Sequence, residues 1–333
     1  MTTQSRRLLT RLRGVGLVAL LAGSACENAG SSLGFGDAAT GTIRVGIFLD
    51  RDGSKTPSAI DTTLAQIRIQ LQPAAGGGVV RSQLTDQDGL AVFEGVPFGE
   101  YRVRPDPTIL GDSLLVGRVD SATISVVPTD TVGDVVVRLD YPETSVKAAR
   151  ALPAGRRIFL RGILLSTLQT FRDTTVHLAD TSGFLRLTGA GFLGSTTGNN
   201  AGDSVTVIAY TGQRDGQPVA TQARIFRLAL RPPPVPIPVS SAVAATADLG
   251  RIDAALVQVT SATISDSATV APDFKVVASD GSGDLEILID GTISVNRTLF
   301  RPGRSMTVRG VLVPNGAGGW RVKPRDGSDI QLF

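Results

Sequence analysis

Short runs in which apolar and polar residues alternate recur along this 333-residue chain, and they restrict its fold more than any other feature. Residues 43–49, 67–71, 121–126 and 134–139 each carry an apolar side chain at every second position. A period of two is typical of a half-buried β-strand, because successive side chains of a strand point to opposite faces. Glycine (38) and proline (18) are frequent between such runs. The pattern predicts an all-β protein built from short antiparallel strands.

The amino terminus has the features of an export signal. Four arginines, at positions 6, 7, 11 and 13, precede an apolar run at residues 17–26 that is too short to span a bilayer. The run ends in Ser24-Ala25-Cys26, which resembles the lipobox of bacterial lipoproteins, although Gly23 stands where that family prefers Leu. The resemblance implies that residues 1–26 are a signal peptide and that Cys26 is the lipid attachment site. It also implies export and a lipid anchor in the bacterial envelope, in the outer membrane and facing the periplasm or the surface. An ordinary secretory signal with an incidental cysteine is the alternative.

The single cysteine also limits the chemistry of the exported part. Cys26 lies at the signal boundary, so the remaining chain has no disulfide, no cysteine nucleophile and no thiolate metal site. Residues 27–39 are small and polar without an apolar period, which is typical of a flexible tether.

Residues 85–103 form the most specific motif downstream of the tether. Asp88-Gly89 predicts a tight turn, residues 92–93 begin a strand, residues 96–99 make a second turn, and Tyr101 and Val103 return to the core. The motif resembles the Cna-B and carboxypeptidase-regulatory-like domains, also found as SdrD-B-like domains, which are prealbumin-like β-sandwiches that act as stalks of bacterial surface proteins. The resemblance implies such a sandwich over residues 40–141.

Some members of that family bind Ca²⁺, and others form a Lys–Asn isopeptide bond. Asp50 and Asp52, followed by Asp61, are a candidate Ca²⁺ site, because a hard cation prefers several oxygen ligands on a turn. No other cofactor is expected. The Lys–Asn isopeptide bond of some members is excluded, because residues 40–141 contain one lysine, Lys55, and no asparagine.

A second pattern begins after residue 142 and occurs twice. Residues 175–187 and 274–289 both read as strand, Asp-x-x-Gly turn and strand, and residues 202–209 match residues 303–310. We therefore expect two copies of one domain, at residues 142–231 and 239–333. The proline-rich residues 232–238 between them predict an extended spacer rather than a strand.

Each copy is similar to the five-stranded OB-fold modules found beside secreted nucleases and lamin-tail domains. The carboxyl-terminal Pro324-Arg325 and Asp329-Ile330 match the Pro-Arg-x-x-x-Asp-Ile ending of those modules. The predicted architecture is therefore a prealbumin-like β-sandwich followed by two OB-like β-barrels.

Groups suited to catalysis are scarce in this sequence. His177 is the only histidine, and because Val176 and Leu178 are expected to face the core, its ring is predicted to lie at the surface. Gly-x-Ser-x-Gly and phosphate-binding Gly-rich motifs do not occur. Trp320 follows two glycines in a predicted hairpin, where it is expected to plug the core. We therefore expect a protein that is not an enzyme.

Binding by the barrels is the remaining function. The middle segment, residues 142–238, carries 11 basic and 5 acidic side chains. Arg156, Arg157 and Arg161 with Phe159 and Phe171 have the composition of a single-strand nucleic-acid interface, in which arginines contact phosphates and aromatic rings stack on bases. The leading hypothesis is a lipid-anchored envelope protein, a stalk plus binding modules that contact a protein or envelope polymer. An accessory nucleic-acid-binding module is the alternative.

Overall fold

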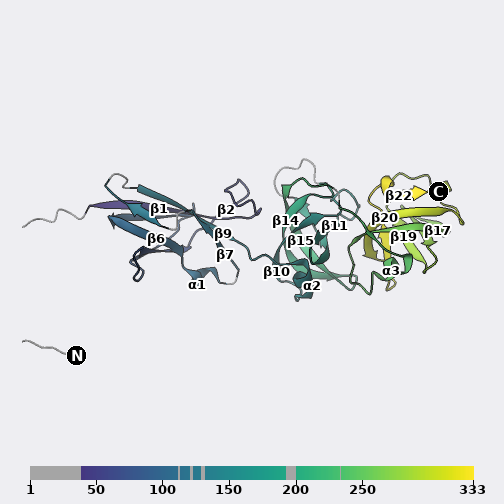
Figure 1. Ribbon diagram of the computed structural model, residues 1–333, viewed down its shortest axis with the longest axis horizontal. Helices are drawn as coiled ribbons and strands as arrows, with labels where there is room; N and C mark the ends of the chain where they lie inside the picture. Colours follow the sequence, from purple (N-terminus) through teal and green to yellow (C-terminus); the bar gives the residue numbers. More distant parts are fainter. Residues whose placement is uncertain (1–38, 112, 121–122, 129–131, 193–199, 233) are drawn as a thin grey trace, which may run out of the picture. The chain divides into compact units, whose positions relative to one another are not determined.

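The computed structural model describes residues 39–111, 113–120, 123–128, 132–192, 200–232 and 234–333 (Figure 1). Residues 1–38, with the predicted signal peptide, Cys26 and nearly all of the tether, lie outside the described part of the chain. The described residues form an all-β protein, as the alternation predicts, with a sandwich followed by two OB-like barrels, as the resemblances imply. Within them, no helix has the length and hydrophobicity needed to cross a bilayer.

The sandwich consists of two sheets that enclose one apolar core. Its strands are β1 (Thr40–Leu49), β2 (Thr62–Thr63), β3 (Arg68–Pro73), β4 (Arg81–Leu84), β5 (Leu90–Pro97), β6 (Gly99–Pro105), β7 (Leu115–Val119), β8 (Ile124–Val126) and β9 (Val132–Asp140), with helix α1 (Pro107–Leu110). One sheet has the order β2-β1-β9-β7 with β5 also paired to β1, and the other has the order β4-β3-β6-β8. The alternate apolar residues of both sheets are buried, among them Ile43, Val45, Ile69, Leu71, Tyr101, Val103, Val137 and Leu139.

The turn predicted at Asp88-Gly89 is present and depends on its glycine. Gly89 has a φ of +74°, a conformation that costs a residue with a side chain about 1–2 kcal/mol. A Cβ atom at this position would also lie 2.7 Å from the backbone oxygen of Ile47 and 2.9 Å from Cβ of Thr63. The turn therefore admits only glycine without a shift of β1.

The first barrel is closed by five strands. Its elements are α2 (Val146–Ala151), β10 (Arg157–Leu164), β11 (Val176–Asp180), β12 (Gly183–Thr188), β13 (Gly191–Phe192), β14 (Ser204–Arg214) and β15 (Gln217–Ala229). The order is β12-β11-β10-β14-β15, and a parallel pairing of β12 with β15 completes the ring. Five strands closed in this order form an OB-like barrel.

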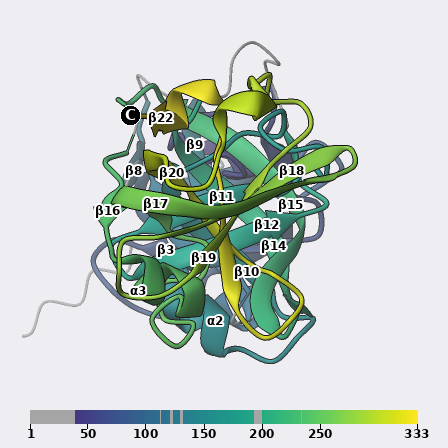
Figure 2. The same cartoon turned by 90° about the vertical axis from the view of Figure 1, so that its right-hand side faces the viewer.

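The second barrel, which faces the viewer in Figure 2, repeats this topology. Its elements are β16 (Ile237–Pro238), α3 (Ser241–Thr246), β17 (Leu256–Val270), β18 (Asp273–Ser279), β19 (Leu285–Ile289), η1 (Arg297–Leu299), β20 (Ser305–Pro314), β21 (Trp320–Lys323), η2 (Gly327–Asp329) and β22 (Ile330–Leu332). The ring runs β17-β18-β19-β21-β20 and closes by pairing β20 with β17, and β19 is parallel to β21.

The two barrels share one strand register, offset by 100 residues. Val176 pairs with Leu187 in the first hairpin, and Val276 pairs with Ile287 in the second. The Asp-x-x-Gly turns of the two barrels also share a structural role, because the aspartate of each turn caps the short helix at the start of its barrel. The Asp180 carboxylate accepts the N–H of Val146 at 2.8 Å, and the Asp280 carboxylate accepts the N–H of Ser241 at 3.0 Å. Hydrogen bonds from Ser282 and Ser241 hold the pKa of Asp280 well below its usual range.

The expectation that residues 232–238 avoid strand structure is wrong at its carboxyl-terminal end. Ile237 and Pro238 form β16, which pairs in parallel with β17. Proline is tolerated there because β16 lies at the edge of its sheet, where a missing N–H costs no ladder hydrogen bond.

Candidate functional site

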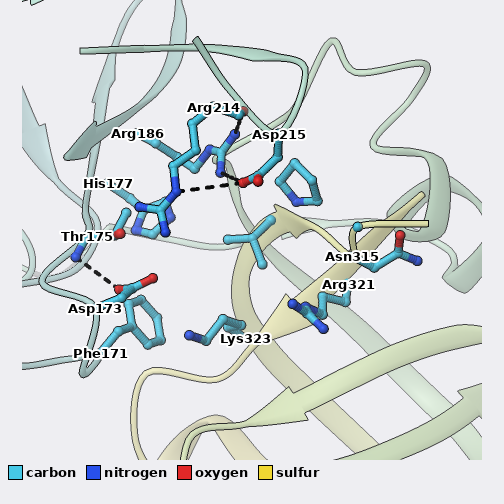
Figure 3. A pocket seen from close by; sticks show the side chains of 13 residues that line it. Phe171, Asp173, Thr175, His177, Arg186, Arg214, Asp215, Asn315, Arg321 and Lys323 are labelled. Carbon is cyan, nitrogen blue, oxygen red and sulfur yellow. Dashed lines mark hydrogen bonds and ion pairs between the residues drawn. The ribbon is translucent and has the colours of Figure 1, made fainter. Parts of the chain in front are cut away.

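A cavity of about 220 Å³ lies between the two barrels. The first barrel contributes the face of β11 and β12 and the β14–β15 turn, and the second contributes β21 and the end of β20 with the residues that follow it (Figure 3). The lining residues are Phe171, Asp173, Thr175, His177, Arg186, Arg214, Asp215, Val313, Pro314, Asn315, Gly316, Arg321 and Lys323. In Figure 3, Arg321 and Lys323 approach from the side opposite to His177, Arg186 and Arg214. The cavity is therefore a composite of both barrels, rich in cationic side chains.

His177 is buried in the wall of this cavity, so the prediction of a surface histidine is wrong. The side chain is 1% exposed and meets the ring of Phe171 edge-on at 5.7 Å between centroids. Its Nδ1 lies 2.9 Å from the hydroxyl of Ser166, while its Nε2 is buried and has no hydrogen-bond partner among the described residues. Burial, assisted by the nearby positive charge of Arg186, lowers the pKa of His177 to about 3.

The cations of the cavity are held in place by ion pairs at its edges. Arg186 is 4% exposed and donates from Nη1 to Asp215 at 3.1 Å and from Nη2 to the carbonyl of Arg214 at 2.9 Å. Arg321 donates to Glu286 at 2.9 Å. The Lys323 ammonium lies 4.4 Å from the centroid of the Phe171 ring. These pairs fix the positions of the charged groups before any ligand arrives.

One fully buried carboxylate joins the two barrels next to the cavity. Asp253, in the segment before β17, is 0% exposed and lies 3.5 Å from Nη1 of Arg150 and 3.8 Å from Nε of Arg186, both in the first barrel. Its Oδ1 accepts the indole N–H of Trp320 at 2.8 Å. Trp320 is half-buried against the core of the second barrel, so its ring serves packing as expected.

The ending Pro324-Arg325 to Asp329-Ile330 also contributes to this junction. The Arg325 guanidinium binds both carboxylate oxygens of Asp329 at 2.9 Å, and its Nη1 donates to the carbonyl of Leu165 in the first barrel at 3.3 Å. The motif that supports the OB-fold resemblance therefore holds a turn and a contact between the barrels.

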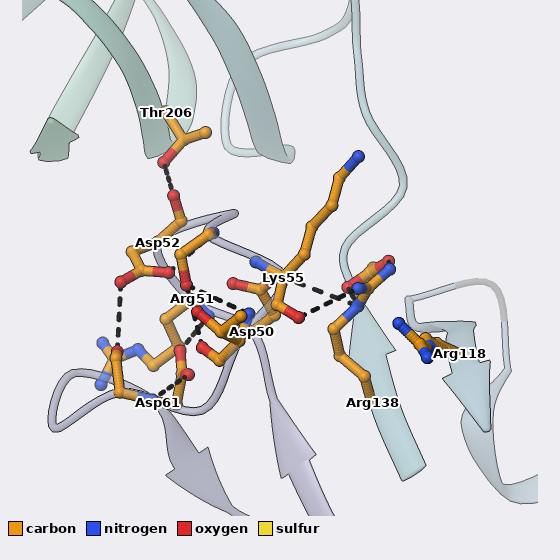
Figure 4. A network of polar contacts seen from close by, with 12 residues as sticks. Asp50, Arg51, Asp52, Lys55, Asp61, Arg118, Arg138 and Thr206 are labelled. Carbon is orange, nitrogen blue, oxygen red and sulfur yellow. Dashed lines mark hydrogen bonds and ion pairs between the residues drawn. The ribbon is translucent and has the colours of Figure 1, made fainter. Parts of the chain in front are cut away.

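The three predicted calcium ligands do come together in the sandwich (Figure 4). Asp50 and Asp52 are buried, Asp61 is half-buried, and one oxygen of each lies within 4.8 Å of the others. Asp50 follows β1, and the loop after it folds back so that the other two carboxylates face it.

Most oxygens of this cluster also accept hydrogen bonds from the loop. The Asp52 oxygens accept the N–H of Ser54 and the hydroxyl of Ser58. Both oxygens of Asp61 accept backbone N–H groups, and one oxygen of Asp50 accepts the N–H of Lys55 at 2.8 Å. The other oxygen of Asp50, Oδ1, is buried and has no hydrogen-bond partner among the described residues. Calcium takes 6–8 oxygen ligands, so these three carboxylates would supply part of a site, and the calcium assignment stays a prediction.

The two buried carboxyl groups of this cluster differ in pKa. Burial raises the pKa of Asp50, and its contact with Asp52 raises it further. Burial also acts against ionisation of Asp52, but hydrogen bonds from Ser54 outweigh it and lower the pKa of Asp52. Asp50 is therefore the weaker acid of the two, and the guanidinium of Arg138 lies 3.9 Å from it.

The predicted nucleic-acid residues do not form a stacking surface. Phe159 is 7% exposed, in a cluster with Ile208 and Phe226, and Phe171 is 2% exposed beneath Lys323. Other parts of the chain cover the rings of Phe159 and Phe171, so neither ring is free to stack on a base. Their assignment as base-stacking residues is therefore corrected to core packing.

The three arginines assigned to the same interface are placed differently from one another. Arg156 is exposed and has no side-chain partner among the described residues. Arg157 stacks over the ring of Tyr141 at 4.5 Å and donates to its hydroxyl at 2.6 Å. Arg161 is half-buried and lies 3.8 Å from Glu143.

Sequence reasoning missed the cavity because its residues come from two copies of the repeat. The signal that was available is the cross-strand pair His177 and Arg186, two polar residues on the face away from the core of the first barrel. The second copy carries Val277 and Glu286 at the matching register positions. A polar pair in one copy of a repeat and a different pair at the matching positions of the other copy indicate that this face has different neighbours in the two copies.

No protein-family model matches the chain, and no curated protein matches its sequence. Solved structures with some likeness include GBS52, the minor pilin of Streptococcus agalactiae, at 15% identity over 31% of this chain and 45% of the pilin, with a TM-score of 0.24. The HINa domain of Ifi202, solved with a 20-base-pair double-stranded DNA, matches at 10% identity over 54% of this chain and 97% of that domain, with a TM-score of 0.26. Asparaginyl-tRNA synthetase from Pyrococcus horikoshii matches at 15% identity over 24% of this chain, with a TM-score of 0.21. The chain spans under half of the pilin and 20% of the synthetase. Similarity at this level assigns neither a family nor a function.

Proposed function

We propose that this chain is a non-enzymatic binding protein, held at the bacterial envelope by a lipid on Cys26, in which the sandwich is a stalk and the two barrels contact an envelope protein or polymer. The observation that carries the proposal is the junction at Asp253. A fully buried carboxylate of the second barrel has its ion-pair partners in the first barrel, so this contact favours docking of the two modules. Docked modules would present one joint surface to a partner, which would lower the entropic cost of binding.

The chemistry beside the junction supports binding over catalysis. Ser166 and His177 have the spacing of a nucleophile and its base, 2.9 Å, but Ser166 is 0% exposed and cannot reach a substrate. The Ser166 hydroxyl also accepts the backbone N–H of His177 at 3.0 Å, as a structural group does. A histidine with a pKa near 3 is a weak base, and at neutral pH it is not the imidazolium ion that would serve as a general acid.

A nucleic-acid role is the weaker candidate. Stacking supplies about 1–3 kcal/mol per base in single-strand binding proteins, and the two rings predicted for it, Phe159 and Phe171, are buried. Phosphate contacts from exposed arginines such as Arg156 would remain. Oligonucleotide binding at low salt tests this role, because affinity based on phosphate contacts alone falls steeply as salt is added.

Metabolic labelling with an alkyne fatty acid tests the anchor. The full chain is expressed in a bacterial host as wild type, as Cys26→Ala and as Ser24→Ala, the matched control that keeps a small residue before the cysteine. Label in the wild type and in Ser24→Ala, with none in Cys26→Ala, is the expected result. Absence of label from the wild type would remove the lipid from the proposal. Cosedimentation of the protein with isolated cell-wall sacculi then tests the polymer contact.

A further inference from the structure

The side chains that line the cavity between the barrels have a net positive charge. Four are cationic (Arg186, Arg214, Arg321 and Lys323), two are carboxylates (Asp173 and Asp215), and His177 is neutral. The lining therefore has a formal charge of +2 at neutral pH. Further carboxylates pair with the cations outside this lining, since Glu286 binds Arg321 and Asp290 lies 3.7 Å from Lys323.

The hydrogen-bond pattern of His177 makes it a donor toward this cavity. The Ser166 hydroxyl oxygen accepts a hydrogen bond from the backbone N–H of His177. The hydroxyl hydrogen of Ser166 has one acceptor within reach among the described residues, Nδ1 of the His177 ring. Nδ1 is then an acceptor, so the neutral ring carries its hydrogen on Nε2. That N–H is buried in the cavity wall without a partner. A buried donor of this kind is stabilised by an acceptor atom from a ligand.

We propose that this cavity binds the phosphate group of a small phosphomonoester, with the Nε2 hydrogen of His177 and the guanidinium groups of Arg214 and Arg321 as donors from opposite sides. A phosphomonoester carries a charge of about −1.5 to −2 at pH 7 and can accept hydrogen bonds from the cationic side chains of the lining, in competition with the carboxylates that already pair with them. Guanidinium groups present several N–H donors in one plane and suit the oxygens of phosphate. Donors on opposite walls suit a tetrahedral group better than a planar carboxylate.

The size of the cavity limits the ligand. About 220 Å³ corresponds to roughly seven water molecules at about 30 Å³ each. This volume holds a phosphate group with a short organic remainder, and it is below the range of about 300–1,000 Å³ that is common for drug-sized ligands. The site goes beyond the envelope contact proposed above, and labelling of Cys26 remains unaffected if no phosphate binds.

Isothermal titration calorimetry on the full chain at low ionic strength tests the site. The probes are glycerol 3-phosphate, inorganic phosphate and succinate, a dicarboxylate that serves as the matched dianion. The variants are Arg214→Gln and Arg321→Gln, and the control is Arg309→Gln, an exposed arginine of β20 whose side chain contacts Gln258. Loss of one charge-assisted hydrogen bond lowers affinity about ten-fold or more.

We expect glycerol 3-phosphate to bind more tightly than succinate, both variants to weaken it at least about ten-fold, and the control to match the wild type. Vesicles of phosphatidylcholine with phosphatidic acid identify the source of the group. Sedimentation with these vesicles, reversed by glycerol 3-phosphate, indicates a lipid headgroup, and its absence indicates a soluble phosphomonoester. No heat with either phosphate compound, equal loss in the control, or tighter binding of succinate would overturn the proposal.

A second measurement needs no variant. Because His177 is the only histidine, its imidazole nitrogens give one set of ¹⁵N resonances. We expect the pattern of a neutral ring with the hydrogen on Nε2, and a shift of the Nε2–H signal when glycerol 3-phosphate is added. A hydrogen on Nδ1, or signals that do not respond to the ligand, would contradict the assignment.

Discussion

Replacing Asp253 by alanine removes the carboxylate that joins the two barrels. In the wild type this side chain is 0% exposed, accepts the Trp320 indole N–H at 2.8 Å and lies 3.5 Å from Arg150 and 3.8 Å from Arg186. The alanine variant leaves the 4% exposed Arg186 with one fewer counter-charge and Trp320 without its acceptor. Arg186 remains buried, so water cannot replace the counter-charge that it loses.

The expected loss follows from the burial of these groups. Breaking a buried ion pair by removing one partner costs about 3–5 kcal/mol in the free energy of unfolding. The control is Asp284→Ala, which removes an exposed carboxylate of the same barrel, and such surface changes stay within about 0.5 kcal/mol. We therefore expect the two alanine variants to differ by at least about 2 kcal/mol.

Urea unfolding followed by circular dichroism measures this difference. Fluorescence of Trp320, the single tryptophan, reports separately on the environment of the junction. Asp253→Asn keeps an acceptor for the indole and should fall between wild type and Asp253→Ala. A loss under about 1 kcal/mol for Asp253→Ala would refute the claim that this carboxylate holds the barrels together.

Three further changes probe other parts of the chain. Because burial holds the pKa of His177 below its usual 6.5, wild-type stability should fall as pH drops from 6.5 toward 3, by up to about 1.4 kcal/mol per pH unit. In urea unfolding at several pH values His177→Gln should lack that component, and equal slopes would contradict the burial of a neutral ring. Asp50→Asn should raise the thermal unfolding midpoint at pH 7, since it removes a carboxyl group whose raised pKa opposes folding above its ordinary pKa. A rise of the wild-type midpoint with added calcium would support the predicted calcium site, and an unchanged midpoint would contradict it. Gly89→Ala should lower the free energy of unfolding more than Gly95→Ala does. At Gly95 only the left-handed backbone opposes a side chain, at a cost of about 1–2 kcal/mol, because no atom lies within 4 Å of the added Cβ. Equal losses of the two variants in urea unfolding would show that the Gly89 turn can relax.

The alternation of side chains predicted the strands and their buried faces well. The strand at residues 43–49 and the duplicated hairpins all appear, and Val176 and Leu178 face the core of the first barrel as expected. These features depend on each strand's own neighbours, which a period of two describes.

Exposure could not be predicted in the same way. The period correctly places His177 on the face away from the core, but exposure depends on what covers that face. In this chain the second barrel covers it, with Lys323 and Val313 among the residues opposite. Phe159 is covered similarly, by residues outside its own hairpin. Burial between modules depends on docking, which a single strand's sequence does not encode.

The duplicated register indicates that the cavity can exist only in the tandem. The two barrels contact each other through different surfaces of the same fold. Positions that match in the repeat therefore have different surroundings and need different residues. Here Arg186 of the first copy corresponds to Glu286 of the second, where the carboxylate binds Arg321 on the opposite wall of the cavity. The same register position therefore provides a cation, Arg186, to the first wall of the cavity. In the second barrel it provides Glu286, the counter-ion of Arg321 on the other wall. Neither barrel alone carries both walls, so separating them would abolish phosphate binding even if each barrel still folded.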